Sequence, residues 1–129
     1  DETAQFPFKH VKKNKGAAGL DRVSNKQFEK DLDNHIMAIH KSLRKEIYRP
    51  SPSVRIFIEK DGNKKIPIDI PTVKDRVIQQ AIRQVIEPIF EEDFSDNSFG
   101  FRPNRSAHDA INRVEQYKNE GYRYVLDTA

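Results

Sequence analysis

The sequence predicts an α+β fold that is rich in helix and contains one β-hairpin, and two kinds of periodicity support this prediction. Apolar residues recur three or four positions apart over three long segments, which is the spacing of one helix face. Apolar and polar residues alternate over 54–58 and again over 66–70, as in strands. The turn-forming residues Asp61, Gly62 and Asn63 lie between these strands, so we expect them to pair as a hairpin. At 129 residues, the chain supports one domain with a modest core.

The first helix is expected to begin after Ser24. Ser24 and Gln27 have the spacing of a capping box, in which two side chains satisfy free N–H groups at a helix start. The apolar positions that follow define one stripe: Phe28, Leu32, Ile36, Ile39, Leu43 and Ile47. Pro50 and Pro52 are expected to end this helix. Before it, the paired glycines of segment 16–19 favour a flexible loop.

Two further helices have start signals of the same kind. Thr72 and Asp75 form a cap pair, and Pro88 is expected to kink or end the helix that they open. Its inward residues are predicted to be Val73, Val77, Ile78, Ala81, Ile82, Val85 and Ile86. Ser106 and Asp109 open the last helix. Its predicted inward face is Ala107, Ala110, Ile111, Val114 and Tyr117.

Composition excludes several classes of protein. The chain has no cysteine, which excludes disulfides and thiolate metal sites. It has no apolar run near the roughly 20 residues that span a bilayer, and no signal-peptide pattern, so we expect a cytoplasmic protein that does not contact membranes. Residues 1–60 hold 13 Lys and Arg against 8 Asp and Glu, whereas residues 61–129 hold 10 against 12. The N-terminal half is therefore the better candidate for a polyanion surface.

The segment 98–106 (SFGFRPNRS) has the features of an anion contact. Gly100 lets a backbone approach a ligand closely, because it has no Cβ. Arg102 and Arg105 flank a turn beside the expected helix start at Ser106, where free N–H groups and the helix dipole favour phosphate. The alternative is that both arginines only solvate a loop.

The same segment resembles the second fingers block of group II intron reverse transcriptases, which are also called intron maturases. Three other segments resemble blocks of that family, in the family's order. Residues 14–21 (NKGAAGLD) are similar to its N-terminal block, 70–81 (IPTVKDRVIQQA) to its first fingers block, and 124–127 (YVLD) to the strand that leads into its first catalytic motif. The four blocks together cover nearly the entire chain.

This resemblance implies a division of the chain and a function. Residues 1–121 would be the fingers region, and residues 122–129 would begin a truncated palm strand, so the fold would be a helix-rich fingers subdomain with a β-hairpin plus one edge strand of the palm. The parent enzyme would copy RNA into DNA with Mg²⁺ and deoxynucleoside triphosphates (dNTPs). Its partners would be an RNA template, a DNA primer, dNTP and its own intron RNA.

The resemblance also assigns site residues. Lys60 matches the family's triphosphate-contacting hairpin lysine. The second hairpin arginine of the family falls on Ile66, so either Lys65 takes that role after a shift of one residue or the nucleotide is held differently. Arg76 is a nucleotide-contact candidate, with the alternative that Asp75 caps the helix and Arg76 is its surface partner. Template or primer contacts are predicted at Lys12, Lys13, Lys15, Arg102 and Arg105. The three lysines could instead form a disordered basic edge.

No catalytic residue is expected in this chain. Two-metal nucleotidyl transfer needs carboxylates that hold two divalent ions about 4 Å apart. In the family, the first of these is the second Asp of an Asp-x-Asp pair. Asp127 matches the first Asp of that pair, and Ala129 stands where the catalytic one belongs. We therefore expect the chain alone to bind no metal or other cofactor and not to polymerise.

Two alternatives stay open at this stage. The chain could be a stand-alone basic RNA-binding module without a polymerase role, or an interaction domain whose charge only solubilises it. Phosphate contacts make affinity for nucleic acid fall steeply with salt, which separates the polymerase fragment and the RNA-binding module from the interaction domain. Nucleotide binding separates the polymerase fragment from the RNA-binding module.

The predicted strand 122–127 yields a first test. Without neighbouring strands, we expect this segment to fray or to pair with a second copy of the chain as a dimer. Hydrogen exchange on the monomer should therefore show faster exchange at Tyr122–Asp127 than in the helix that follows Thr72. Equal protection of the two segments in a monomer would contradict this expectation.

Overall fold

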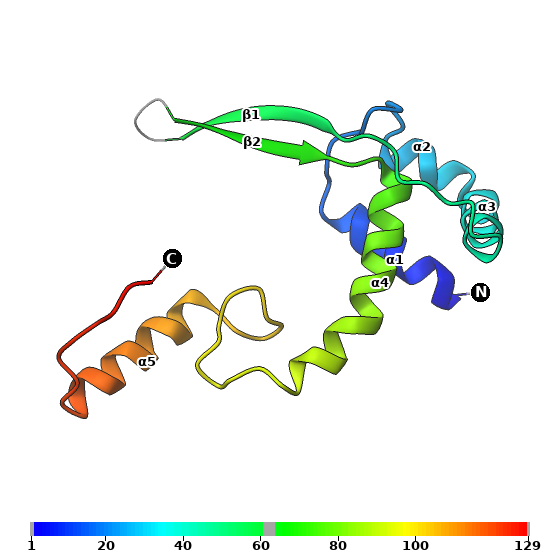
Figure 1. Ribbon diagram of the computed structural model, residues 1–129. Coiled ribbons are helices and arrows are strands. Elements are labelled where there is room, and N and C mark those ends of the chain that lie inside the picture. Colours follow the sequence, from blue (N-terminus) through cyan, green and yellow to red (C-terminus); the bar gives the residue numbers. More distant parts are fainter. Residues whose placement is uncertain (1, 61–63, 129) are drawn as a thin grey trace. The chain divides into compact units, whose positions relative to one another are not determined.

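The computed structural model describes residues 2–60 and 64–128 and confirms the α+β prediction. Its elements are α1 (Glu2–Lys13), α2 (Asn25–Lys30), α3 (Leu32–Arg44), β1 (Val54–Lys60), β2 (Lys64–Ile70), α4 (Val73–Glu91) and α5 (Ala107–Asn119) (Figure 1). The predicted turn residues Asp61, Gly62 and Asn63 and the position Ala129 lie outside the described residues.

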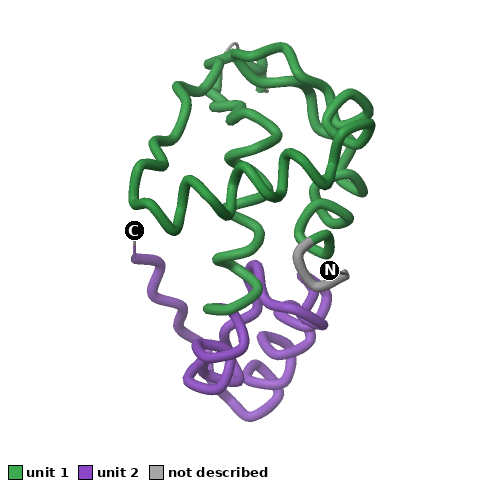
Figure 2. The backbone as a smooth tube through the Cα atoms, turned by 90° about the vertical axis from the view of Figure 1, so that its right-hand side faces the viewer, with its two compact units in different colours: residues 1–86 green, residues 87–129 purple. Residues whose placement is uncertain are grey.

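The chain forms two compact units, residues 1–86 and residues 87–129 (Figure 2). The sequence predicted one domain. The division falls inside α4, because only the first part of this helix contributes side chains to a core. The fingers–palm boundary expected after residue 121 stays a prediction.

The core of the first unit lies among α1, α2, α3 and the start of α4. Its buried members are Phe8, Val11, Phe28, Ile39, Val73, Val77 and Ile78. Phe28 is central to the aromatic packing, since it stacks on Phe8 with ring centroids 5.4 Å apart and on His35 at 4.3 Å. α1 has no counterpart among the elements expected from the sequence, and it contains Pro7 although prolines disfavour helix interiors.

The capping box of Ser24 and Gln27 is confirmed, but the single helix predicted after it is divided. Asp31, with φ −131° and ψ 40°, interrupts the helical conformation between α2 and α3. The apolar stripe is buried or half-buried only as far as Ile39. Leu43 and Ile47 are exposed, because the helix ends at Arg44 and the chain turns away from the core.

Asp75 joins the start of α4 to the segment that precedes β1. The predicted Thr72–Asp75 cap is present, with the Asp75 N–H donating to Thr72 Oγ1 (3.2 Å) and the Thr72 hydroxyl donating to Asp75 Oδ2 (2.7 Å). The carboxylate also accepts from the Tyr48 hydroxyl (2.5 Å) and the Ser51 N–H (3.1 Å). Burial works against its ionised form, but these hydrogen bonds outweigh burial and hold the pKa of Asp75 below its usual range. Burial and the bond to Asp75 raise the pKa of Tyr48 to about 12.

The predicted hairpin is confirmed, with β1 and β2 antiparallel and Ile58 opposite Ile66. It projects from the helices of the first unit (Figure 1). One face carries the cross-strand isoleucines, which are 40–48% exposed: Ile56, Ile58, Ile66 and Ile68. On the other face, Arg55 donates Nε and Nη2 to the two carboxylate oxygens of Asp69 at 2.8 and 2.9 Å.

The second unit buries little apolar surface. The capping box of Ser106 and Asp109 is confirmed at α5, but α5 has no buried residue, and its predicted inward side chains Ile111 and Val114 are exposed. Similarly, the predicted inward residues Ile82, Val85 and Ile86 of α4 are exposed, and α4 continues through Pro88 to Glu91.

The strand predicted over 122–127 is not formed. Tyr124, Val125 and Leu126 are almost fully exposed, and no described strand pairs with them. A strand requires a neighbour for its backbone hydrogen bonds, so a strand-like sequence alone does not produce one. No helix in the described ranges is long and apolar enough to cross a membrane.

Replacing Asp75 with Asn is expected to lower the free energy of unfolding by about 2 kcal/mol near neutral pH. An amide would present a donor toward N–H and O–H groups that now donate to a carboxylate. The pKa of Asp75 is depressed in the folded chain. The carboxylate therefore adds to the free energy of unfolding above the unfolded-state pKa of about 3.9, and this contribution is lost as pH falls through the folded-state pKa. Denaturant unfolding at a series of pH values should show weaker acid destabilisation in Asp75→Asn.

Asp69→Asn is the matched control, because Asp69 is an exposed carboxylate in a surface ion pair with Arg55. Its loss of stability should be much smaller. If the free energy of unfolding falls equally with pH in Asp75→Asn and in the unchanged chain, the ionised Asp75 carboxylate does not have this stabilising role.

Candidate nucleic-acid interface

The glycine segment 16–19 is packed against the start of α4. A Cβ added to Gly19 would lie 2.6 Å from Thr72 Cα and 2.8 Å from the carbonyl oxygen of Pro71. Both contacts are with backbone, so a side chain at position 19 would displace the loop from α4. The loop that was predicted to be flexible is therefore positioned by α4.

Arg76 holds the same segment from the α4 side. Its Nη2 donates to the carbonyl oxygen of Ala17 at 2.6 Å, and a Cβ on Gly16 would collide with its Nη1. Burial lowers the pKa of Arg76, with nearby Asp21 acting in the opposite direction, and a guanidinium remains charged at neutral pH. Asp75 thus caps the helix as predicted, whereas Arg76 binds the loop. A nucleotide contact at Arg76 stays a prediction.

A small hollow of about 250 Å³ lies beside Arg76. Its lining residues are Val11, Asn14, Arg76, Gln79, Gln80 and Arg83. The Nε of Arg76 is buried and has no hydrogen-bond partner in the structure. Amide and guanidinium groups converge here, which suits a polar ligand with both donors and acceptors.

The predicted lysine contacts before this loop differ in their surroundings. Lys12 forms an ion pair with Glu29 of α2. Lys13 and Lys15 are exposed, and neither forms an ion pair with another described residue. Lys15 also adopts a left-handed backbone conformation, with φ 48°. Lys13 and Lys15 are therefore the cations of this segment that are available to phosphate.

The hairpin places Lys60 and Lys65 on opposite faces. Lys60 is directly opposite Lys64, so these two share a face, whereas Lys65 is opposite Glu59 on the other face. Ile66, where the resemblance expects an arginine, lies on the face of Lys60. Side chains two residues apart on a strand share a face, so Lys64 is the β2 lysine on the face of Lys60 and Ile66. A shift of one residue from Ile66 to Lys65 leads to the other face.

Arg102 is buried within the turn of the second unit, with a side chain 7% exposed. Its Nε and Nη2 donate to Glu91 Oε1 at 3.0 and 2.7 Å, and its Nη1 donates to the carbonyl oxygens of Ser95 (2.7 Å) and Ser98 (3.0 Å). The guanidinium also lies 5.2 Å from the Phe94 ring centroid. Four of its five N–H donors are thus used within the chain. Its predicted contact with nucleic acid stays a prediction.

Arg105 is more accessible than Arg102. Its bonds to Asp96 are at 3.5 Å, and it lies over the Phe99 ring at 5.7 Å. It lines a groove of about 360 Å³ together with residues of α5 such as Asn112 and Arg113. Between the two arginines of this turn, Arg105 is the one that can reach a ligand without breaking the turn.

The N-terminus of α5 is already occupied by a carboxylate of its own chain. The Ser106 N–H donates to Asp109 Oδ2 at 2.8 Å, and the Asp109 N–H donates to Ser106 Oγ at 3.2 Å. Hydrogen bonds from the Ser106 side chain and backbone hold the pKa of Asp109 below its usual range. An external phosphate at this helix end would compete with the Asp109 carboxylate.

The residues predicted around the catalytic position are placed only in part. Asp127 is exposed and lies in an irregular segment, and Ala129 is outside the described residues. Within residues 2–60 and 64–128, no group of three or more His, Asp or Glu side chains is arranged to hold a metal ion. The use of Mg²⁺ by the parent enzyme stays a prediction.

Comparison with known proteins supports the resemblance found in the sequence. The chain is 38% identical over 97 residues to protein YkfC of Escherichia coli, which covers 75% of the chain. It is 41% identical over 85 residues to the group II intron-encoded protein LtrA of Lactococcus lactis, covering 65% of the chain. The chain belongs to the group II intron reverse transcriptase/maturase family.

A third relative in this family is nuclear intron maturase 2, mitochondrial, of Arabidopsis thaliana, with 34% identity over 88 residues and 64% of the chain covered. The matched parts are 26% of YkfC, 14% of LtrA and 12% of the Arabidopsis maturase. The chain therefore spans about a quarter or less of the length of these relatives. No family model matches the chain.

The surroundings of Arg102 yield a test of its role. Arg102→Ala should lower the free energy of unfolding by about 2 kcal/mol, because it leaves the Glu91 carboxylate and two carbonyl groups without their donor. Hydrogen exchange should become faster across residues 91–106. Arg105→Ala is the control, and its effect should be smaller because its bonds are long. Unchanged stability of Arg102→Ala would contradict the internal role.

Proposed function

We propose that this chain is the fingers region of an RNA-directed DNA polymerase of the group II intron family. In that role it binds the RNA template and DNA primer and the phosphates of an incoming dNTP, in a parent enzyme that uses Mg²⁺. The observation that supports this function best is the pair Lys60 and Lys64, which face each other across the projecting hairpin.

The position of these two lysines favours a phosphate ligand. Residues directly opposite in an antiparallel pair have Cβ atoms about 5 Å apart, and like charges there destabilise the sheet. Both lysines are exposed, and neither forms an ion pair within the described residues. A triphosphate that binds between the two ammonium groups would remove their repulsion and neutralise its own charge. Lys65 is less suited, because Glu59 lies opposite it.

The glycine segment and the hollow beside Arg76 support the nucleic-acid part of the proposal. Lys13 and Lys15 supply charges for backbone phosphates, which position a nucleic acid without reading its sequence. The side chains of Gln79 and Gln80 add neutral donors and acceptors beside Arg76. The names of the relatives refer to introns and maturases, so we include intron RNA among the proposed partners.

The proposal assigns no catalysis to the chain alone, because Ala129 stands where the family's first catalytic aspartate is expected. The exposed segment 122–128 is proposed to pair with a strand of the parent palm, or with a second copy when the chain is isolated. Its unpaired backbone groups and apolar side chains suit the addition of a strand.

The hairpin pair can be tested by substitution. Lys60→Ala with Lys64→Ala should weaken binding of a dNTP about tenfold, because both lysines that are proposed to bind phosphate are removed. NMR chemical-shift titration with dGTP would measure this, since binding without the palm carboxylates is expected to be weak. The matched control is Lys65→Ala with Lys26→Ala, which removes the same charge from the other hairpin face and from α2.

If both double variants bind dNTP equally weakly, the loss is a general effect of charge, and Lys60 and Lys64 do not form a specific triphosphate site. Detectable template–primer binding without any dNTP binding would instead favour a stand-alone RNA-binding module.

A further inference from the structure

The two free edges of the hairpin differ in what they offer to another strand. Pro67 lies at the centre of β2, opposite Phe57 of β1. A proline has no N–H, and in a paired strand its nitrogen faces the free edge, so the β2 edge lacks its central donor. Phe57 and Pro67 then form a non-hydrogen-bonded pair of the ladder, and the N–H and C=O groups of Phe57 point to the free edge of β1. The β1 edge contains no proline.

The β1 edge is also accessible. Residues 55–60 are exposed, and the side chain of Phe57 at their centre is 62% exposed. The hairpin projects from the helices of the first unit (Figure 1), and within the described residues its sheet has two strands. A strand with unpaired backbone groups and an exposed aromatic side chain is suited to pairing with another chain.

The sequence of β1, VRIFIEK, is complementary to itself in the antiparallel direction. When Phe57 is placed opposite Phe57 of a second copy, Arg55 of each copy lies opposite Glu59 of the other. In the same register, Ile56 of each copy lies opposite Ile58 of the other. The backbone groups of residues 55, 57 and 59 point to the free edge, so this register forms the hydrogen bonds of an antiparallel ladder.

The charge complementarity continues across the four strands that this pairing would produce. Within each hairpin, Asp69 lies opposite Arg55 and Lys65 lies opposite Glu59. Each charged row therefore alternates in sign, with Asp69 and Arg55 of one copy followed by Glu59 and Lys65 of the other. The bonds to Asp69 use Nε and Nη2 of Arg55 and leave Nη1 for the carboxylate of the second copy. Opposite charges at facing positions stabilise a sheet.

The other face of the same arrangement is apolar at its centre and keeps the lysines apart. Each central row contains four isoleucines, which are Ile68, Ile56 and, from the second copy, Ile58 and Ile66. Lys60 lies opposite Val54 of the second copy. The two Lys60 positions are then six residues apart along the strands, or about 20 Å. Lysine repulsion disfavours associations that bring two hairpin ends together, but it does not oppose this one.

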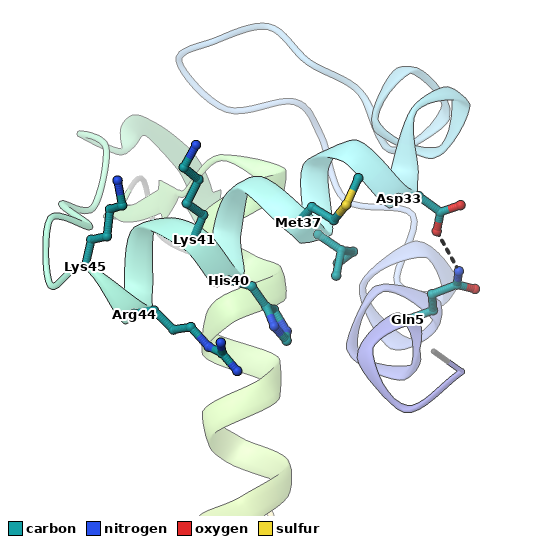
Figure 3. Close-up of a pocket in the computed structure, with 8 residues that line it drawn as sticks. Gln5, Asp33, Met37, His40, Lys41, Arg44 and Lys45 are labelled. Carbon is teal, nitrogen blue, oxygen red and sulfur yellow. Dashed lines mark hydrogen bonds between the residues drawn. The ribbon is translucent and has the colours of Figure 1, made fainter.

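We propose that a second copy of this chain docks on β1, so that two hairpins form one four-stranded antiparallel sheet about a two-fold axis at Phe57. The proposal does not rest on the proposed function. A contact through the groove between α3 and α1 is disfavoured, because Lys41, Arg44 and Lys45 line it and would repel the same groove of a second copy (Figure 3). The proposed contact involves one strand from each copy, so the dimer is expected to be weak.

Two double variants test the facing charges while the formal net charge stays at +3. The first combines Arg55→Glu with Asp69→Lys, and the second combines Glu59→Lys with Lys65→Glu. Each variant keeps opposite charges within its own hairpin, but it places like charges at both contacts between two of its copies. Mixing the two variants restores opposite charges at both contacts.

Sedimentation equilibrium over protein concentrations up to about 1 mM measures the association. The unchanged chain should dimerise, each variant alone should dimerise about tenfold more weakly, and an equimolar mixture should recover the original affinity. Circular dichroism checks that both variants are folded. The proposal is overturned by an unchanged chain that stays monomeric, by variants that dimerise normally, or by a mixture of folded variants that dimerises no better than its components.

A disulfide test locates the axis without changing any charge at the facing pairs. The chain has no cysteine, so Phe57→Cys supplies a single thiol. Facing Cα atoms of a hydrogen-bonded antiparallel pair lie about 5.5 Å apart, which is within disulfide reach. Under mild oxidation this variant should cross-link much faster than Lys65→Cys, whose copies lie at least three strand spacings, or about 14 Å, apart. Equal rates of cross-linking would overturn the proposed axis.

A last variant separates this contact from the pairing predicted for residues 122–127. Val125→Pro removes a backbone donor from that segment and leaves the hairpin unchanged, so the β1 dimer should persist. Loss of the dimer in Val125→Pro would mean that the copies associate through the C-terminal segment, and the β1 contact would then be wrong.

Discussion

The buried carboxylate of Asp75 is the interaction on which the rest of the first unit depends. It accepts hydrogen bonds from Tyr48, Ser51 and Thr72, so one side chain fixes the start of α4 and the segment that leads into β1. The next residue, Arg76, holds the glycine segment through Ala17. Two consecutive residues therefore position the base of the hairpin and the glycine loop, so the part of the candidate interface in the first unit is built around the first turn of α4.

Local signals in the sequence predicted much of this fold. The hairpin and the cap pairs at Ser24, Thr72 and Ser106 were predicted correctly, because each depends on residues within a few positions of one another. What the sequence did not reveal depends on contacts across the chain. Whether residues 122–127 form a strand depends on a partner, and whether the later part of α4 is buried depends on what covers it. α1 was not among the expected elements, and Pro7 inside it is a residue that disfavours helix interiors.

The candidate site shows the same limit at the level of single residues. The sequence identified Arg102 as a cation in a distinctive turn, but only the structure reveals that Glu91 and two carbonyl groups occupy its donors. Spacing from Glu91 to Arg102 carries no signal of such a pair, because the turn between them is irregular. Lys64 differs, since the alternation of β2 already placed it on the face of Lys60, and its proposed role depends on strand geometry that the sequence contains.

The exposed isoleucines of the hairpin have a consequence for solubility. A two-stranded sheet has two open edges, and a β-branched apolar face beside open edges is a template for aggregation. Lys60, Lys64 and Lys65 at the far end would supply charge repulsion between the hairpins of different copies. The same lysines would then act as gatekeepers against self-association until a ligand neutralises them, so ligand binding and colloidal stability of the isolated chain are coupled through one set of side chains.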